Sequence, residues 1–104
     1  MSDHFVWSER LGIYIPYLTM GWEQYNYCDQ IGIIEEWEFV RGSIPDRIMV
    51  FEHVINEKQA ELNDEENFER SCLLTYEIAE YASRINELQI WYRMNQELES
   101  RQHS

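Results

Sequence analysis

The sequence predicts an all-α protein, a helical bundle built on a long antiparallel helical hairpin. Apolar residues recur every three or four positions through most of the chain, which is the spacing of one helix face. Helix-capping residues stand at several boundaries of this pattern, and only 4 glycines and 2 prolines interrupt the 104 residues. We expect helices at about 17–31, 33–41, 44–61 and 64–99, of which the last two form the hairpin.

Residues 1–15 allow two interpretations. Phe5, Trp7, Leu11 and Ile15 could lie along one helical stripe. The stretch from Gly12 to Ile15 also alternates like a short extended segment before a proline. We expect a loop or a short turn of helix that packs its aromatic side chains onto the bundle.

The first two expected helices follow Pro16, which is tolerated in the first turn of a helix. Gly32 is expected to kink or split this region. Gly42 directly follows Arg41, whose cation suits a helix C-terminus, and it stands where a capping glycine is common. These residues predict a helix end at about position 41.

The two helices of the hairpin have their own start signals. Ser43 precedes Pro45 and Asp46 in the pattern of a capping box, with Asp replacing the usual Glu. Asn63 can cap the last helix, with Glu66 at its third position. The short break at this point predicts an antiparallel pair.

The last expected helix carries an apolar seam and is longer than its partner. The excess length must be covered either by the N-terminal helices or by a second copy of the chain. A homodimer would use the C-terminal part of the seam, through Leu88, Ile85 and Tyr92. The seam residues recur at spacings of four and three and are Leu74, Ile78, Tyr81, Ile85, Leu88 and Tyr92.

The charge is strongly negative, with 20 acidic against 8 basic residues and a formal net charge of −12. Such a field disfavours nucleic acid and anionic membrane surfaces as partners, because both repel carboxylates. It favours a basic protein partner. The acidity alternatively serves solubility alone.

The remaining composition predicts one cytoplasmic domain over residues 1–104. The sequence begins without a basic region followed by an apolar run, and no apolar stretch approaches the length of a membrane span. Cys28 and Cys72 form no CxxC pair, and we expect two buried, reduced thiols, with one disulfide as the alternative.

Motifs for catalysis and cofactor binding are absent from the sequence. It contains no phosphate-binding glycine loop, nucleophile elbow or zinc spacing. His53 and Glu57 share a helix face, which suits an exposed ion pair better than a metal site. Glu77 and Glu80 are expected to belong to a solvated face. We therefore expect no enzyme, no cofactor and no metal.

Aromatic residues are concentrated in the first forty positions, and a small bundle cannot bury all of them. Trp37 and Phe39, for example, cannot both lie at the centre of one helix face. We expect a small acidic protein-binding module that neutralises or regulates a basic partner, of the immunity-protein, inhibitor or nucleic-acid-mimic type; the alternative is a structural homodimer. The expected contact residues are aromatic or acidic and are Trp22, Tyr25, Trp37, Glu77, Glu80 and Trp91.

Overall fold

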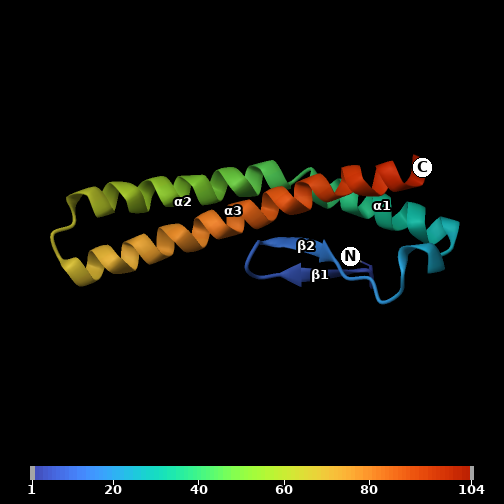
Figure 1. The fold of residues 1–104 in the computed structure, drawn as a ribbon, viewed down its shortest axis with the longest axis horizontal. Coiled ribbons are helices and arrows are strands. Elements are labelled where there is room, and N and C mark those ends of the chain that lie inside the picture. The colour runs from blue at the N-terminus through green and yellow to red at the C-terminus, as the bar shows by residue number, and fades with distance from the viewer. Residues whose placement is uncertain (1, 104) are drawn as a thin grey trace.

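The computed structural model describes the backbone of residues 2–103 and the side chains of residues 2–94. Helices α2 and α3 lie side by side as the predicted antiparallel hairpin, α1 lies along the far part of α3, and a small β-hairpin lies beside α3 (Figure 1). The molecule measures 59 × 23 × 19 Å along its principal axes. In chain order the elements are β1 (Phe5–Ser8), β2 (Ile13–Pro16), the 3₁₀ turn η1 (Trp22–Gln24), α1 (Tyr27–Arg41), α2 (Ile44–Asp64) and α3 (Phe68–His103).

The β-hairpin is the main departure from the predicted all-α class. The described part of this region, residues 2–15, forms neither a helical stripe nor a simple loop, because β1 pairs with β2 in antiparallel register. Six of the eight strand residues are aromatic or β-branched, and such residues favour extended backbone. Gly12 closes the turn at φ +71°, and its N–H donates to the carbonyl of Ser8 at 2.8 Å. A left-handed conformation of this kind is open to glycine at little cost.

Helix α1 begins ten residues later than the expected helix and is not split. Pro16 ends β2, and the helix starts after Asn26, whose side-chain oxygen accepts a hydrogen bond from the backbone N–H of Asp29 at 2.8 Å. Gly32 lies inside the continuous helix. Glycine lowers helix stability by about 1 kcal/mol but leaves the hydrogen-bond ladder intact, so it need not break a helix.

The junction of α1 and α2 is a bend without the predicted caps. Gly42 and Ser43 both keep right-handed helical angles, so Gly42 is not a left-handed cap. The Ser43 hydroxyl donates back to the carbonyl of Val40 at 2.6 Å and forms no capping box with Asp46. Pro45 explains the bend, because it lacks an N–H and its ring crowds the carbonyl four residues earlier.

The connection between α2 and α3 lies slightly beyond the predicted break. Helix α2 continues through Asn63 to Asp64, and residues 65–67 form the turn. Asn67 caps α3, because its side-chain oxygen accepts the backbone N–H of Arg70 at 2.9 Å. The predicted cap at Asn63 is therefore wrong by one helical turn.

The predicted seam of α3 faces inward, except at its C-terminal end. Tyr92 is partly exposed, and Trp91 packs against the core instead. A straight helix drifts relative to a strict seven-residue repeat, which explains the shift by one position. The buried core cluster joins all elements except η1 and consists of Phe5, Leu11, Ile13, Tyr25, Ile33, Trp37, Val40, Ile44, Phe51 and Leu88.

Helix α1 covers part of the excess length of α3. The rings of Trp37 and Trp91 meet edge to face at 5.8 Å between centroids. The Arg41 guanidinium lies over the Tyr92 ring, and its Nε donates to the Tyr92 carbonyl at 2.8 Å. Leu88 is fully buried within this same core, so it cannot meet a second copy without unfolding the chain.

Candidate protein-binding surface

The turn of the β-hairpin is fixed to α3 by polar and apolar contacts. Arg10 Nε donates to Glu87 at 3.0 Å, and its other nitrogens reach Glu80 at 3.4 Å and the Ser83 hydroxyl at 2.9 Å. The hydrogen bond to Glu87 raises the pKa of the Arg10 guanidinium. The next residue, Leu11, is fully buried. These contacts place the outer surface of the hairpin in a defined position beside α1.

An aromatic groove lies between the hairpin and the C-terminal end of α1. Trp7 and Tyr14 form a cross-strand pair whose rings meet edge to face at 5.1 Å between centroids. Phe39 of α1 contributes a ring that is 81% exposed, and Trp7 is 50% exposed. We call this hollow of about 390 Å³ the aromatic groove; its lining residues are Trp7, Gly12, Ile13, Tyr14, Phe39, Val40, Gly42 and Ser43.

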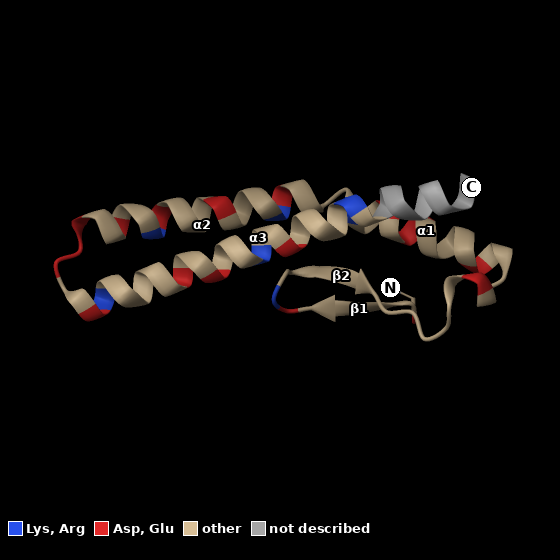
Figure 2. Ribbon diagram, viewed as in Figure 1, with Lys and Arg blue, Asp and Glu red and all other residues tan. Residues whose placement is uncertain are grey.

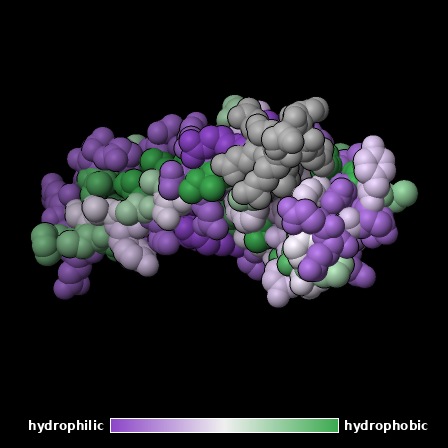
Figure 3. Space-filling view, turned by 45° about the vertical axis from the view of Figure 1, so that its right-hand side comes forward, coloured by the Kyte–Doolittle hydropathy of each residue, from purple (hydrophilic) through white to green (hydrophobic). Residues whose placement is uncertain are grey.

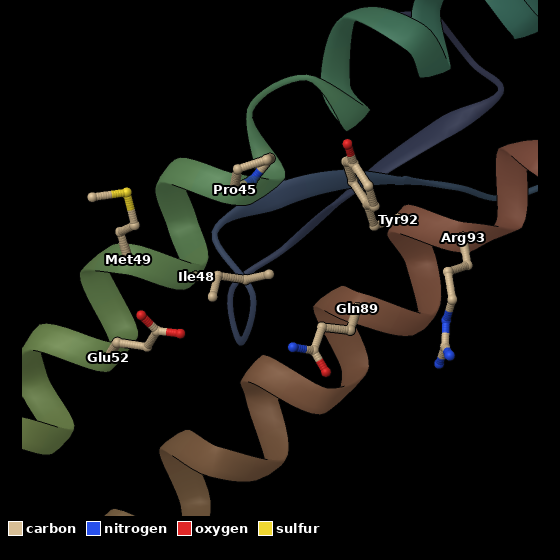
Figure 4. A pocket seen from close by; sticks show the side chains of 7 residues that line it. All are labelled: Pro45, Ile48, Met49, Glu52, Gln89, Tyr92 and Arg93. Carbon is tan, nitrogen blue, oxygen red and sulfur yellow. The ribbon is translucent and has the colours of Figure 1, made fainter.

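A second groove runs between α2 and α3, and we call it the interhelical groove. It has a volume of about 510 Å³. Ile48 of α2 and Gln89 of α3 point into the space between the helices (Figure 4). Glu52 and Arg93 give its two walls opposite charges. The groove is thus less acidic than the rest of the molecule.

The basic side chains of the described part of the chain are largely occupied by contacts within the fold. Four of them form ion pairs with carboxylates: Arg10, Arg41, Lys58 and Arg70. The guanidinium groups of Arg47 and Arg84 lie over the rings of Phe51 and Tyr81, at 4.9 Å and 4.7 Å from the centroids. Few cations are left to compensate the remaining acids.

Carboxylates without an ion pair among the described side chains therefore dominate the surface. Figure 2 shows acidic residues along α2 and α3, in the turn between them and near the start of α1. His53 and Glu57 form the expected exposed pair at 3.2 Å. The exposed carboxylates without such a partner include Glu9, Glu23, Asp29, Glu35, Asp46, Glu52, Asp64, Glu66 and Glu69.

The aromatic residues predicted as contacts have packing roles. Tyr25 and Trp37 are buried, and the Tyr25 hydroxyl accepts hydrogen bonds from the backbone N–H groups of Thr19 and Met20. Trp22 and Trp91 are half-buried against the core. A partner-binding role for these four residues stays a prediction. The most exposed aromatic rings belong to other residues.

The two predicted acidic contacts are held by different parts of the fold. Glu77 accepts a hydrogen bond from Lys58 of α2 at 2.5 Å, and this bond lowers the pKa of Glu77. Glu80 pairs with Arg10 of the hairpin. These carboxylates do not act as one pair, because they are held by cations of different elements. Lys58 of α2 holds Glu77, whereas Glu80 shares Arg10 of the hairpin with Glu87.

The strongly exposed aromatic residues were missed by the sequence reasoning. The impossibility of burying both Trp37 and Phe39 was a usable signal, and the structure buries Trp37 and exposes Phe39. Figure 3 shows hydrophobic residues among hydrophilic ones along the two-helix end of the molecule. The most exposed rings outside the groove are Tyr17, Tyr27, Phe68 and Tyr76.

Both cysteines are exposed, free thiols, and the prediction that they are buried is wrong. Cys28 lies in the first turn of α1, and Cys72 lies on the face of α3 that is turned away from the core. Within residues 2–94 no three His, Cys, Asp or Glu side chains gather in a way that could hold a metal ion. No helix in the described part of the chain is long and apolar enough to cross a membrane.

A scan of protein-family models, a search of curated proteins and a search of solved structures each find no match to this chain.

Proposed function

We propose that this protein is an acidic binding module that neutralises or regulates a basic protein partner. The observation that carries the proposal is that most basic side chains are engaged in contacts within the fold. Four basic side chains form ion pairs and two stack on rings, so the exposed charge of a chain with a net charge of −12 is mainly carboxylate. A field of this kind steers a basic partner toward the molecule.

The frame that carries these carboxylates is elongated and helical. The acids extend over both long helices and both ends instead of forming one compact patch (Figure 2). Such a distribution suits a partner with an extended basic surface, such as one that otherwise binds nucleic acid. An inhibitor of the nucleic-acid-mimic type would present its carboxylates where the partner expects phosphates.

Charge supplies attraction at a distance, whereas affinity at contact needs buried anchors. Exposed Trp and Tyr are enriched among the residues that dominate binding energies. The aromatic groove supplies Trp7, Tyr14 and Phe39 at one place on the surface. We therefore propose that the partner contacts the end of the molecule that carries the hairpin and α1.

The test is capture of a partner from the lysate of the source cell on the immobilised protein, followed by elution with a salt gradient. A basic protein should elute as salt rises, because the screening length falls from about 10 Å at 0.1 M to about 3 Å at 1 M. Recovery of the protein itself alone, or retention that salt does not weaken, would contradict the proposal.

Two triple variants locate the contact, and each removes three negative charges from exposed side chains. The first combines Glu23→Gln, Asp29→Asn and Glu35→Gln near α1. The second combines Asp64→Asn, Glu66→Gln and Glu69→Gln at the opposite end of the molecule and serves as the control. The first variant should lower the association rate more than the second. Equal effects would show that only the total charge matters.

A homodimer is the second candidate function, and the outer face of α3 favours it. The N-terminal part of this face is exposed and uncharged at Phe68, Cys72, Tyr76 and Ala79, which recur at helical spacing. Sedimentation should then show a dimer at micromolar concentration that salt strengthens, because two chains of −12 repel each other. The Tyr76→Glu variant should dissociate the dimer, whereas Tyr27→Glu should leave the dimer intact. A monomer at every salt concentration would exclude it.

A further inference from the structure

We propose that the aromatic groove binds an arginine side chain of the basic partner. The inference rests on the proposed function and makes it more specific, because it assigns one anchor and one residue type. The groove is lined by two rings of the hairpin, Trp7 and Tyr14, and by one ring of α1, Phe39. A guanidinium is planar and weakly hydrated, and it stacks on aromatic faces more readily than an ammonium does.

The geometry of the rings favours such a ligand. The edge-to-face contact between Trp7 and Tyr14 holds the two rings in a fixed orientation without covering both of their faces. Phe39 is 81% exposed, so most of its ring meets only solvent. An incoming flat cation can therefore lie against a ring face without displacing any side chain of the core.

Carboxylates stand next to the rings in the sequence and on the same elements. Glu35 precedes Phe39 by four residues on α1 and so lies on the same helix face. Glu9 follows Trp7 by two residues in the hairpin turn. Both side chains are exposed, and neither forms an ion pair with another described side chain. They can accept hydrogen bonds from a guanidinium that stacks on the neighbouring rings.

The fold itself contains the same recognition chemistry. Arg41 lies 4.3 Å from the centroid of the Tyr92 ring, and Arg47 lies 4.9 Å from that of Phe51. Arg47 passes beneath the hairpin turn, but its guanidinium is held by the Leu11 carbonyl at 3.2 Å and by the Phe51 ring. None of the cation–ring contacts among the described residues involves Trp7, Tyr14 or Phe39, so these rings are open to an arginine of the partner.

The experiment titrates the protein with short capped peptides and follows the tryptophan indole N–H signals by NMR. The peptides carry three arginines, three lysines or three citrullines, and citrulline matches arginine in shape but carries no charge. The Trp7 signal is assigned with Trp7→Phe. We expect the arginine peptide to shift the Trp7 signal and to bind about two- to fivefold more tightly than the citrulline peptide, the range of an exposed cation–π contact. The lysine peptide should lie between them.

Matched variants test the place of binding. Phe39→Ala should weaken arginine binding about two- to fivefold. Phe68→Ala is the control, because Phe68 is 80% exposed at the opposite end of the molecule, and it should leave binding unchanged. Equal affinity for citrulline and arginine, or equal effects of the two variants, would overturn the inference. Failure of lysate capture with a positive peptide result would instead reject the basic protein partner and keep the arginine site.

Discussion

Trp37→Ala should be among the most damaging substitutions in this protein. The Trp37 side chain is 1% exposed and joins α1 to α3 through its edge-to-face contact with Trp91. Truncation of a buried Trp to Ala costs about 3–5 kcal/mol, and the lost ring pair adds about 0.5–1.5 kcal/mol. A chain of this length has an unfolding free energy of roughly 5–15 kcal/mol, so the variant loses about a quarter of it or more.

Urea denaturation followed by circular dichroism measures this loss. With a slope of about 2 kcal/mol per molar urea, a loss of 4 kcal/mol lowers the midpoint by about 2 M. Phe39→Ala is the control, because Phe39 lies two residues away on the same helix but is 81% exposed. That variant should change stability by about 0.5 kcal/mol or less. A loss below about 1 kcal/mol for Trp37→Ala, or equal losses for both variants, would refute the proposed packing of α1 on α3.

Three further predictions concern the turns and one ion pair. Gly12→Ala should destabilise the hairpin by about 1–2 kcal/mol, because φ is +71° there, and thermal unfolding measures this. Asn67→Ala should cost about 1 kcal/mol, as a lost helix cap does, whereas Asn63→Ala should cost almost nothing; equal losses would contradict the observed cap. The hydrogen bond between Lys58 and Glu77 lowers the pKa of Glu77 from its ordinary value of 4.5 and raises that of Lys58 from 10.5. Its stabilisation should be present between these values, and it should fade as pH falls through the lowered pKa of Glu77 or rises through the raised pKa of Lys58; a Glu77→Gln variant with an unchanged pH profile of stability would contradict this.

The positions of the exposed aromatic residues were only partly accessible to sequence reasoning. Trp37 and Phe39 are two positions apart on one helix and so point in different directions. One of them must therefore lie outside the core, but the pattern alone does not say which. Packing decides, because Trp91 of α3 provides a ring against which Trp37 fits. The groove itself joins Trp7 and Phe39, which lie far apart in the sequence, so only the folded chain brings them together.

The sequence by itself determined the two long helices, their antiparallel pairing and most of the inward-facing seam, because these features depend on local periodicity and a short connection. It also determined the negative charge. The tertiary structure decided the β-hairpin, since strand pairing depends on contacts between separate segments. It also decided which basic side chains form ion pairs within the fold. It also placed α1 over the excess length of α3, because that contact buries Trp37 against a helix fifty residues away.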